Sequence, residues 1–423
     1  MQWRFSPEPA GGSLAGAQAS WPAVALSSLW SRRSMLRTAL ALPAGLAAGG
    51  LAGGAQVLPS TRLVFPRDHG AHPAFRTEWW YATGVLQAGQ GEMLGFQITF
   101  FRTRVDVNLG DAPPGRFTPR HVLFAHGALT DVQGGKLWHG QRIGRWNGDP
   151  AVRPHFAALA DTGVQLGGWS LERTGVPQSV QPSPSSAPLS APQPSAAAPA
   201  AFHTGAYLAR LAEPDFGFEL ALSPTQPLLL QGEAGFSRKK KKLAQASHYY
   251  SQPQLAVSGR VHVQGRARNV TGTAWLDHEW SESLLHPEAV GWDWIGMNLD
   301  SGAALTAFRL RRADGSALWM GGSWRASAHA APQVFGPQSC QWEPLRHWVS
   351  PASQARYPVQ WRVDTPAGSF EVRALLDAQE LDSRRSTGTV YWEGLSELLD
   401  ARSGQRVGRG YLEMTGYAGR LTL

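Results

Sequence analysis

Hydrophobic and polar residues alternate along most of the chain after its first sixty or so residues, and long amphipathic helical patterns are hard to find. An alternation with a period of two is typical of β-strands that bury one face. The pattern therefore predicts a mostly β protein. The expected strands are Glu78–Leu86, Met93–Arg104, Phe124–Asp131, Gly217–Leu222, Gln254–Val263, Gly272–Trp280, Trp292–Leu299, Ala303–Arg311, Ala317–Ser327, Gln360–Asp364, Ser369–Ala374, Thr387–Gly394 and Gly410–Tyr417.

Short turn signals separate these segments. Asp300-Ser301-Gly302 and Ala313-Asp314-Gly315-Ser316 each lie between two apolar strands and predict tight turns. Strands joined so closely form antiparallel meanders. The predicted fold is therefore all-β, with two antiparallel β-barrels or half-barrels packed together and a cleft between them.

The chain is long enough for more than one domain. Of its 423 residues, roughly 360–370 remain after a leader over residues 1–58, which favours two domains of ordinary size. An aromatic cluster followed by a small-residue strand opens each half, at Glu78–Gly84 and at Ser247–Ser251. We therefore expect an N-terminal domain over 59–250 and a C-terminal domain over 251–423.

Two segments depart from the strand pattern. Val176–Ala200 consists mainly of Pro, Ser and Ala and cannot bury enough apolar surface to fold, so we expect a disordered insertion in the first domain. Arg238–Gln245 contains a basic run, which is typical of a solvated loop; the alternative is a patch that binds lipid or a polyanion.

A twin arginine lies near the N-terminus. Arg32-Arg33 comes directly before the Ala/Gly/Leu-rich run Met35–Ala55, which ends in small residues suited to cleavage. This predicts a twin-arginine export signal and a periplasmic or secreted protein. The run is too rich in glycine to favour a permanent membrane span. The alternative is that the run is not cleaved and anchors the protein at its N-terminus. A peripheral association with the membrane or with the export system is a further expectation.

The charge and the cysteine content of the chain exclude further classes of partner and site. The net charge is +8, but the arginines are scattered among aromatic residues rather than massed on one helix, so nucleic acid is not expected as a partner. Cys340 is the only cysteine, which excludes an intramolecular disulfide and cysteine-based zinc sites. The oligomeric state stays open.

The densest group of chemically active side chains begins at Asp277. On one predicted strand, Asp277 and Glu279 should project from one face, and His278 and Trp280 from the other. Acids set among aromatic faces suit two tasks: holding an apolar ligand, or protonating one and shielding the resulting cation. The alternative is that the aromatic residues fill a barrel core while the acids cap turns.

Trp292-Asp293-Trp294 continues this group. The two indoles share a face of the next strand, and the carboxylate points away from them. The alternative to a catalytic role is that these acids bind neighbouring backbone amides or Arg309 and Arg311.

A second group of candidates lies in the first domain. Its expected ligand-binding residues are Glu78, Trp79, Trp80, Tyr81 and His126, with His248, Tyr249 and Tyr250 facing the cleft from the second half. A packing role is the alternative for Trp79 or Trp80, since a tryptophan near the first strand often plugs such a barrel. No ligand-like spacing with carboxylates is found for His121, His139, His155 and His203, so no metal is expected. The sequence has no Gly-x-Ser-x-Gly motif, which disfavours a classical serine hydrolase.

These motifs together resemble the CrtC/AttH-like family over roughly residues 60 to 423. The segments that carry the resemblance are Phe65–Gly70, Glu78–Tyr81 with Thr83-Gly84, Ala125-His126, Leu230–Gly232, Ser247–Ser251, Ala274–Trp280, Gly291–Trp294 and Gly410–Tyr417. The family is named for carotenoid 1,2-hydratase and includes bacterial secreted proteins described only as predicted hydrolases. The resemblance implies a calycin-type architecture of two lipocalin-like β-barrel domains.

Two functions follow as hypotheses. The first is a hydratase or hydrolase that acts on an apolar isoprenoid- or lipid-like molecule and needs no cofactor. Its proton would come from Asp277, Glu279 or Asp293, its cation would be stabilised by Trp280, Trp292 and Trp294, and His278 would orient water or a carboxyl group. The alternative is a periplasmic carrier of a hydrophobic ligand. A buried carboxyl group among tryptophan faces would favour the enzyme.

Overall fold

The computed structural model describes residues 55–105, 120–151, 153–175, 205–240, 245–283 and 285–421. All of them belong to one of the chain's two units, Ala52–Leu423. Most of the predicted leader, the predicted insertion over 176–200 and residues 241–244 of the predicted basic loop lie outside the described residues.

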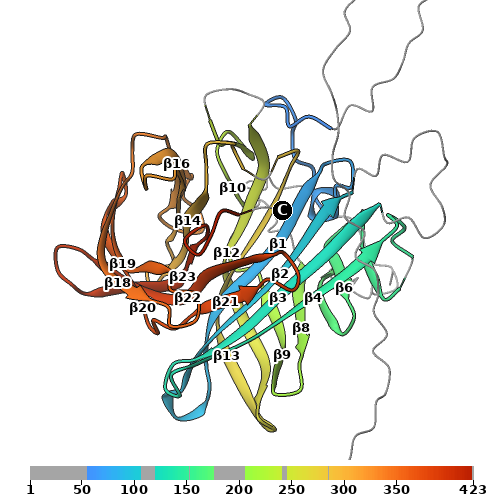
Figure 1. Ribbon diagram of the computed structural model, residues 1–423, viewed down its shortest axis with the longest axis horizontal. Helices are drawn as coiled ribbons and strands as arrows, with labels where there is room; N and C mark the ends of the chain where they lie inside the picture. Colours follow the sequence, from blue (N-terminus) through green and yellow to red (C-terminus); the bar gives the residue numbers. More distant parts are fainter. Residues whose placement is uncertain are drawn as a thin grey trace, which may run out of the picture. The chain divides into compact units, whose positions relative to one another are not determined.

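Two antiparallel sheets make up the fold, so the predicted all-β class is confirmed (Figure 1). Every predicted strand overlaps an observed one. The strands of the first sheet are β1 (Thr77–Gln87), β2 (Met93–Arg104), β3 (His121–Asp131), β4 (Lys136–Trp146), β5 (His155–Ala157), β6 (Gly163–Leu166), β7 (Trp169–Gly175), β8 (Gly205–Ala212), β9 (Phe216–Ser223), β10 (Leu229–Leu230), β11 (Phe236–Arg238), β12 (Ala246–Val263) and β13 (Arg266–Ser281).

The first sheet is a nearly closed barrel. Its strands follow the order β4-β3-β2-β1-β13-β12-β9-β8-β7-β6-β5, and the two end strands β4 and β5 contact each other. The short strands β10 and β11 pair with β12 beside this path. The barrel is filled by an apolar core that includes Trp80, Trp169 and Trp280.

The second sheet is open, so only one of the two expected barrels comes close to a complete ring. Its strands are β14 (Gly291–Leu299), β15 (Ala304–Arg311), β16 (Ala317–Arg325), β17 (Gln333–Phe335), β18 (Gln341–Val349), β19 (Arg356–Thr365), β20 (Gly368–Ala374), β21 (Glu380–Ser383), β22 (Thr389–Asp400) and β23 (Arg406–Met414). They follow the order β17-β16-β15-β14-β23-β22-β20-β19-β18, with β21 beside β22. The edge strand β18 carries Pro344 and shifts register there, which disfavours further pairing.

The chain passes from the first sheet to the second after Ser281. The aromatic cluster Ser247–Ser251, which was expected to open the second half, lies on β12 of the barrel. The domain boundary near residue 250 remains a prediction, because sheet membership does not test independent folding. Both predicted turns are present, with the amide of Gly302 bonded to Leu299 O at 2.9 Å and that of Gly315 to Arg312 O at 3.0 Å.

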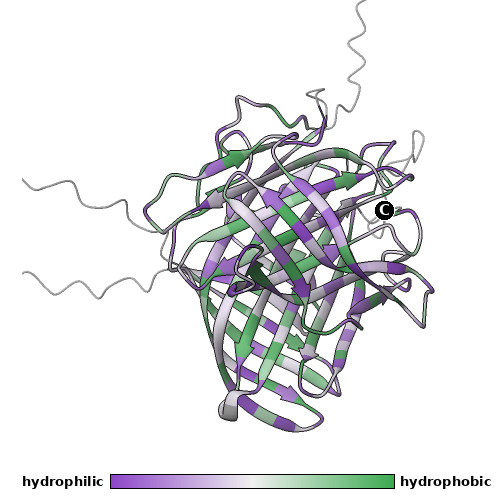
Figure 2. Ribbon diagram, turned by 90° about the vertical axis from the view of Figure 1, so that its left-hand side faces the viewer, coloured by the Kyte–Doolittle hydropathy of each residue, from purple (hydrophilic) through white to green (hydrophobic). Residues whose placement is uncertain are grey.

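Helix is confined, in the described part of the chain, to the 3-10 turns η1 (Arg67–His69) and η2 (Gly89–Gly91). These residues include no helix with the length and hydropathy that a membrane-spanning helix needs. Polar and apolar residues alternate along many of the strands (Figure 2). A separate apolar cluster that includes Tyr81, Trp275, Trp294 and Phe308 joins the outer face of the barrel to the second sheet.

Candidate functional site

Three neighbouring strands of the barrel, β1, β13 and β12, carry most of the predicted site residues. Because residues directly opposite each other share a face of a sheet, the registers define four rows. Trp79–Glu279–Tyr249 and Tyr81–Asp277–Ser251 lie on the outer face; Glu78–Trp280–His248 and Trp80–His278–Tyr250 lie on the inner face. The predicted alternation along Asp277–Trp280 is therefore confirmed, and the candidates divide between two places.

A pocket lies between the outer face of the barrel and the second sheet. Its aromatic lining consists of Trp79, Tyr81, Phe101, Tyr249, Trp292, Trp294, Phe308 and Tyr391, and its four carboxyl groups belong to Asp277, Glu279, Glu393 and Glu413. Both indoles of Trp292-Asp293-Trp294 line it, as their shared face predicted. The pocket thus combines apolar walls with acids, which is the arrangement that distinguishes the enzyme hypothesis from the carrier.

The second sheet supplies one wall of this pocket as a single row. Phe308, Trp294, Glu413 and Glu393 lie opposite one another on β15, β14, β23 and β22. Trp294 Nε1 donates a hydrogen bond to the Tyr249 hydroxyl at 3.1 Å. These bonds and ring contacts fix the two walls against each other.

Asp277 is a buried carboxylate held by three donors. Its Oδ2 accepts from the Tyr249 hydroxyl at 2.6 Å, and its Oδ1 accepts from Ser251 Oγ at 2.5 Å and Trp275 Nε1 at 2.7 Å. Burial raises the pKa of Asp277 to about 7, although these three hydrogen bonds oppose the rise. Asp277 can therefore exchange a proton near neutral pH.

Glu279 has a different environment at the edge of the pocket. Lys239 Nζ lies 2.7 Å from its Oε1, and Ser247 Oγ donates to the same oxygen. The Lys239 ammonium also lies 4.5 Å from the Phe308 ring centroid. This oxygen of Glu279 is therefore engaged by Lys239 and Ser247 rather than free to contact a ligand.

Glu393 and Glu413 form a carboxyl pair in the second sheet. Burial raises the pKa of Glu393 well above its usual range, and the charge of Glu413 raises it further. Burial also raises the pKa of Glu413 to about 7. Gln97 Nε2 donates to Glu393 Oε2 at 2.6 Å, whereas Oε1 is buried with no hydrogen-bond partner among the described residues. Burial therefore favours the protonated form of Glu393, and the Tyr81 and Tyr391 hydroxyl groups lie beside it.

His126 lines the pocket as a neutral imidazole. Its Nδ1 lies 2.9 Å from the Tyr391 hydroxyl and its Nε2 lies 2.9 Å from Ser386 Oγ. Ser386 Oγ donates onward to Gln141, so it accepts from an Nε2–H of the histidine. Burial lowers the pKa of His126 to about 3, so the ring orients neighbouring hydroxyl groups without carrying charge.

Asp293 does not reach the pocket. Its carboxylate lies 2.6 Å from Arg309 Nε and 3.1 Å from Arg311 Nε, and it accepts from the Tyr417 hydroxyl at 2.8 Å. The arginine pairing, which the sequence offered as the alternative to a catalytic role, is therefore confirmed for this residue. Because the strand alternates, the carboxylate lies on the face away from Trp292 and Trp294.

The other candidates form a polar network inside the barrel. Glu78 is fully buried and accepts from Arg102 Nε at 2.9 Å, and the nearest His278 nitrogen, Nε2, lies 3.0 Å from its Oε1. His278 Nδ1 lies 3.1 Å from the Tyr250 hydroxyl. Trp80 stacks on His278, with ring centroids 4.9 Å apart. These residues order the barrel interior and do not line the pocket.

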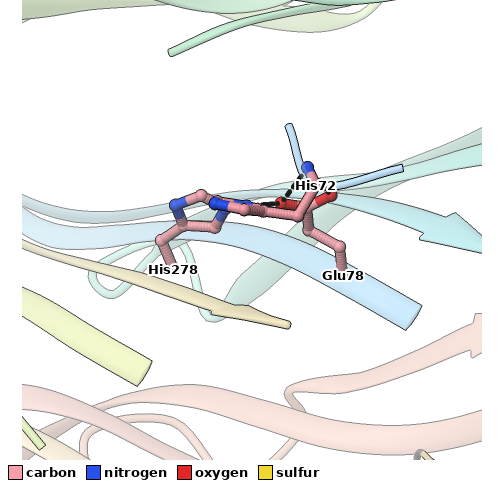
Figure 3. Close-up of side chains that lie close together, drawn as sticks. All are labelled: His72, Glu78 and His278. Carbon is pink, nitrogen blue, oxygen red and sulfur yellow. Dashed lines mark hydrogen bonds and ion pairs between the residues drawn. The ribbon is translucent and has the colours of Figure 1, made fainter. Parts of the chain in front are cut away.

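His72, Glu78 and His278 could be considered as metal ligands, because their donor atoms lie within 4.8 Å of one another (Figure 3). His72 Nδ1 lies 2.8 Å from Glu78, however, and its Nε2 lies 3.4 Å from Asp68. Burial lowers the pKa of His72, but the charges of Glu78 and Asp68 outweigh it and raise this pKa above its usual value. An imidazolium has no free lone pair for a metal, so these residues fit a hydrogen-bonded network better than an ion.

The sequence profile of the AttH-like family matches residues 56–417. The chain belongs to the AttH-like family. A crystal structure of a protein from Nitrosomonas europaea described as AttH is 43% identical, with a TM-score of 0.72 over 86% of this chain and 99% of that one. Kievitone hydratase from Nectria haematococca is 12% identical, with a TM-score of 0.59 over 85% and 94% of the two chains, which shows a shared fold alone. No curated protein matches the chain.

In this AttH-like protein, the sequence analysis missed the carboxyl pair. Glu393 and Glu413 lie in predicted strands, and each follows a tyrosine by two residues, Tyr391 and Tyr411, so that the pairs share a strand face. That repeated spacing was the available signal. Lys239 belongs to the basic run that the sequence placed in a solvated loop, but its ammonium group lies beside Glu279.

Proposed function

We propose that this AttH-like protein is an enzyme that adds water to a carbon–carbon double bond of an apolar small molecule by acid catalysis. One observation carries the proposal. Glu393, a buried carboxyl group with a raised pKa and one oxygen without a partner, lines a pocket with the indoles of Trp79, Trp292 and Trp294. Protonation of an alkene requires an acid that stays protonated at neutral pH beside an apolar ligand.

In the proposed first step, the Glu393 carboxyl group donates its proton to one alkene carbon. The π electrons form the new C–H bond, and the other carbon becomes a carbocation. The carboxylate left on Glu393 lies beside the cation that it has created. The faces of Trp292 and Trp294, which line the same pocket, stabilise that positive charge.

In the second step, a water molecule attacks the cation and loses a proton to the Asp277 carboxylate. Three hydrogen bonds fix the orientation of this carboxylate, and its pKa of about 7 suits it to accept a proton and release it again. Solvent returns a proton to Glu393. The net reaction consumes one alkene and one water and yields an alcohol.

The type of reaction has support from the comparisons only as an analogy. Kievitone hydratase shares the fold, and its name describes a hydration. The resemblance to a family named for carotenoid 1,2-hydratase points in the same direction. Neither likeness identifies the alkene, so the proposal names an uncharged isoprenoid- or lipid-like substrate by the chemistry of the pocket.

We also propose that the enzyme acts in the periplasm. The support is the twin arginine Arg32-Arg33 before an apolar run. Replacing both residues with lysine should leave the protein in the cytoplasm, as cell fractionation and immunoblotting would show. Unchanged export of that variant would refute the twin-arginine route.

The test is hydration in isotopically labelled water. Purified protein is incubated with a panel of uncharged isoprenoid alkenes, and the products are analysed by mass spectrometry. The wild type should yield an alcohol that carries the labelled oxygen. Glu393→Gln should reduce turnover by about a hundredfold or more while the alkene still binds. Asp277→Asn should slow the same reaction.

Glu397→Gln provides a matched control on the same strand, because Glu397 forms an ion pair with Arg373 outside the pocket. It should hydrate alkenes at the wild-type rate. A protein that binds the alkenes but forms no product would refute the hydratase and support the carrier. Full turnover by Glu393→Gln would refute the assigned acid.

A further inference from the structure

The pocket contains more acidic groups than basic ones. Lys239 is the only lysine or arginine that lines it among the described residues, and Lys239 is committed to Glu279 at 2.7 Å. Within the part of the chain that the structure describes, Asp277, Glu393 and Glu413 have no cationic partner in the pocket. When one of these three carboxyl groups is ionised, the lack of a counter-ion in an apolar site disfavours a second anion there.

Two of these acids face each other across one ladder. Glu393 and Glu413 are directly opposite residues on β22 and β23, so their Cβ atoms are separated by about 4.5–5.5 Å. Such a pair holds a proton because both groups cannot ionise together without repulsion. A positive charge placed between them would replace that proton and remove the repulsion.

The remaining wall is aromatic. The indole of Trp294 follows Glu413 in the same row, and its ring packs edge-on against Tyr81 with centroids 5.3 Å apart. The Tyr81 hydroxyl, like Glu393 Oε1, is buried without a hydrogen-bond partner among the described residues. Tryptophan and tyrosine faces attract organic cations, most strongly where water is excluded.

From this geometry we propose that the pocket recognises positive charge on an apolar body: it binds alkylammonium ions between the Glu393–Glu413 pair and Trp294, and it excludes apolar carboxylates. The inference concerns the same site as the proposed function and rests on that proposal only for the nature of the substrate. The substrate is then an uncharged molecule whose charge appears during reaction, and fatty acids are poor ligands.

Binding of a cation is coupled to the protonation of the Glu393–Glu413 pair. The groups that surround the pair are Tyr81, Gln97, Asp277 and Glu279 of the barrel and Trp292, Tyr391 and Tyr411 of the second sheet. Asp293 contributes negative charge from behind the sheet, where Arg309 and Arg311 balance it. The cations near these described groups are already paired, Lys239 with Glu279 at 2.7 Å and the two arginines with Asp293. Binding of a cation therefore favours the ionised pair and releases a proton to solvent.

The experiment compares three ligands of equal chain length, decyltrimethylammonium, decanoate and 1-decanol, by isothermal titration calorimetry. The ammonium ion has no titrating group, so any pH dependence of its affinity comes from the protein. Its affinity should exceed that of decanoate by at least about tenfold and should rise by about tenfold from about pH 5.5 to about pH 8.5. Titration in buffers with different protonation enthalpies should show proton release.

Glu393→Gln and Glu413→Gln each remove a charge with little change of shape. Each should weaken ammonium binding about tenfold and flatten its pH dependence, while 1-decanol binds as to the wild type, which reports an intact pocket. Glu397→Gln should behave as the wild type. Decanoate binding as tightly as the ammonium ion, or ammonium affinity that ignores pH and both substitutions, would overturn the inference.

Turnover is not measured in this experiment, so the two proposals can fail separately. Loss of cation selectivity with retained alkene hydration would refute the recognition of charge alone. Cation selectivity in a protein that hydrates no alkene would refute the hydratase alone.

Discussion

Glu393 on β22 lies directly opposite Glu413 on β23, and both side chains line the pocket between the barrel and the second sheet. Two ionised carboxylates in that relation repel each other, so the pair titrates as a unit and keeps a proton at neutral pH. The proton that the pair holds is the one that hydration of an alkene requires. The titration of the pair also affects the stability of the folded protein.

Glu413→Gln should stabilise the protein at about pH 8 more than at about pH 5. Burial raises the pKa of Glu413 from 4.5 to about 7, so the folded state keeps a proton that the unfolded chain has lost. Wild-type stability therefore falls as pH rises through this window. Glutamine avoids a loss of about 2 kcal/mol. Urea denaturation at both pH values measures the difference, and an equal effect at both would contradict the raised pKa.

Tyr249→Phe should destabilise the protein by about 1–3 kcal/mol, because it leaves the Trp294 indole N–H without its acceptor and removes one of the three donors to Asp277. The Tyr249 hydroxyl donates to Asp277 at 2.6 Å and accepts from Trp294 Nε1 at 3.1 Å. Loss of one donor should also raise the pKa of Asp277 further. Denaturation curves and the pH profile of turnover measure the two effects. Unchanged stability would show that these bonds form no part of the fold.

Glu78→Gln should destabilise the protein by about 3–5 kcal/mol, because it leaves the fully buried Arg102 without its ionic partner. Glu397→Gln breaks a more exposed pair with Arg373 and should cost less than about 1 kcal/mol. Chemical denaturation of both variants gives the comparison. Similar losses in the two would mean that the network inside the barrel contributes little.

A chelator should leave the melting temperature of the protein unchanged. The ring nitrogens of His72 lie 2.8 Å from Glu78 and 3.4 Å from Asp68, so both are engaged by carboxylates rather than free to bind a metal. Differential scanning calorimetry with and without the chelator, together with metal analysis of the purified protein, checks this. A drop in melting temperature that zinc restores would establish a structural metal instead.

Gly296→Ala should displace Trp294 and weaken ligand binding. A Cβ at Gly296 would lie 2.3 Å from Cη2 of the Trp294 indole, so the ring would have to move, at a cost of about 1–3 kcal/mol. Gly168→Ala is the matched control, since a Cβ there would meet no atom within 4 Å. Thermal unfolding and alkene affinity of the two variants should differ clearly. Wild-type affinity in Gly296→Ala would show that the indole can move without consequence.

Local alternation accounted for much of what the sequence could predict. It separated Asp277 and Glu279 from His278 and Trp280, and it separated Asp293 from the two indoles beside it. It could not state which face of the barrel would be filled. The pattern therefore grouped residues of the inner network with residues of the pocket.

The rest of the site depends on pairings between distant segments. Glu393 reaches the pocket because β22 pairs with β23, β23 with β14, and the row then meets Tyr81 and Asp277 of the barrel. No local period encodes that sequence of neighbours. The open second sheet has a similar origin, since the edge strand β18 ends the sheet through Pro344 and its register shifts.

Because the pocket lies on the outside of the barrel, the space for a ligand does not depend on how the barrel closes. Tryptophans and a hydrogen-bonded network fill the ring, so the ring acts as a wall and not as a container. Room for a ligand depends on the spacing of the two sheets and on the connecting residues Leu285, His286 and Thr387 at its border. Longer connecting segments would therefore make room for a larger ligand without any change in the strands of the barrel.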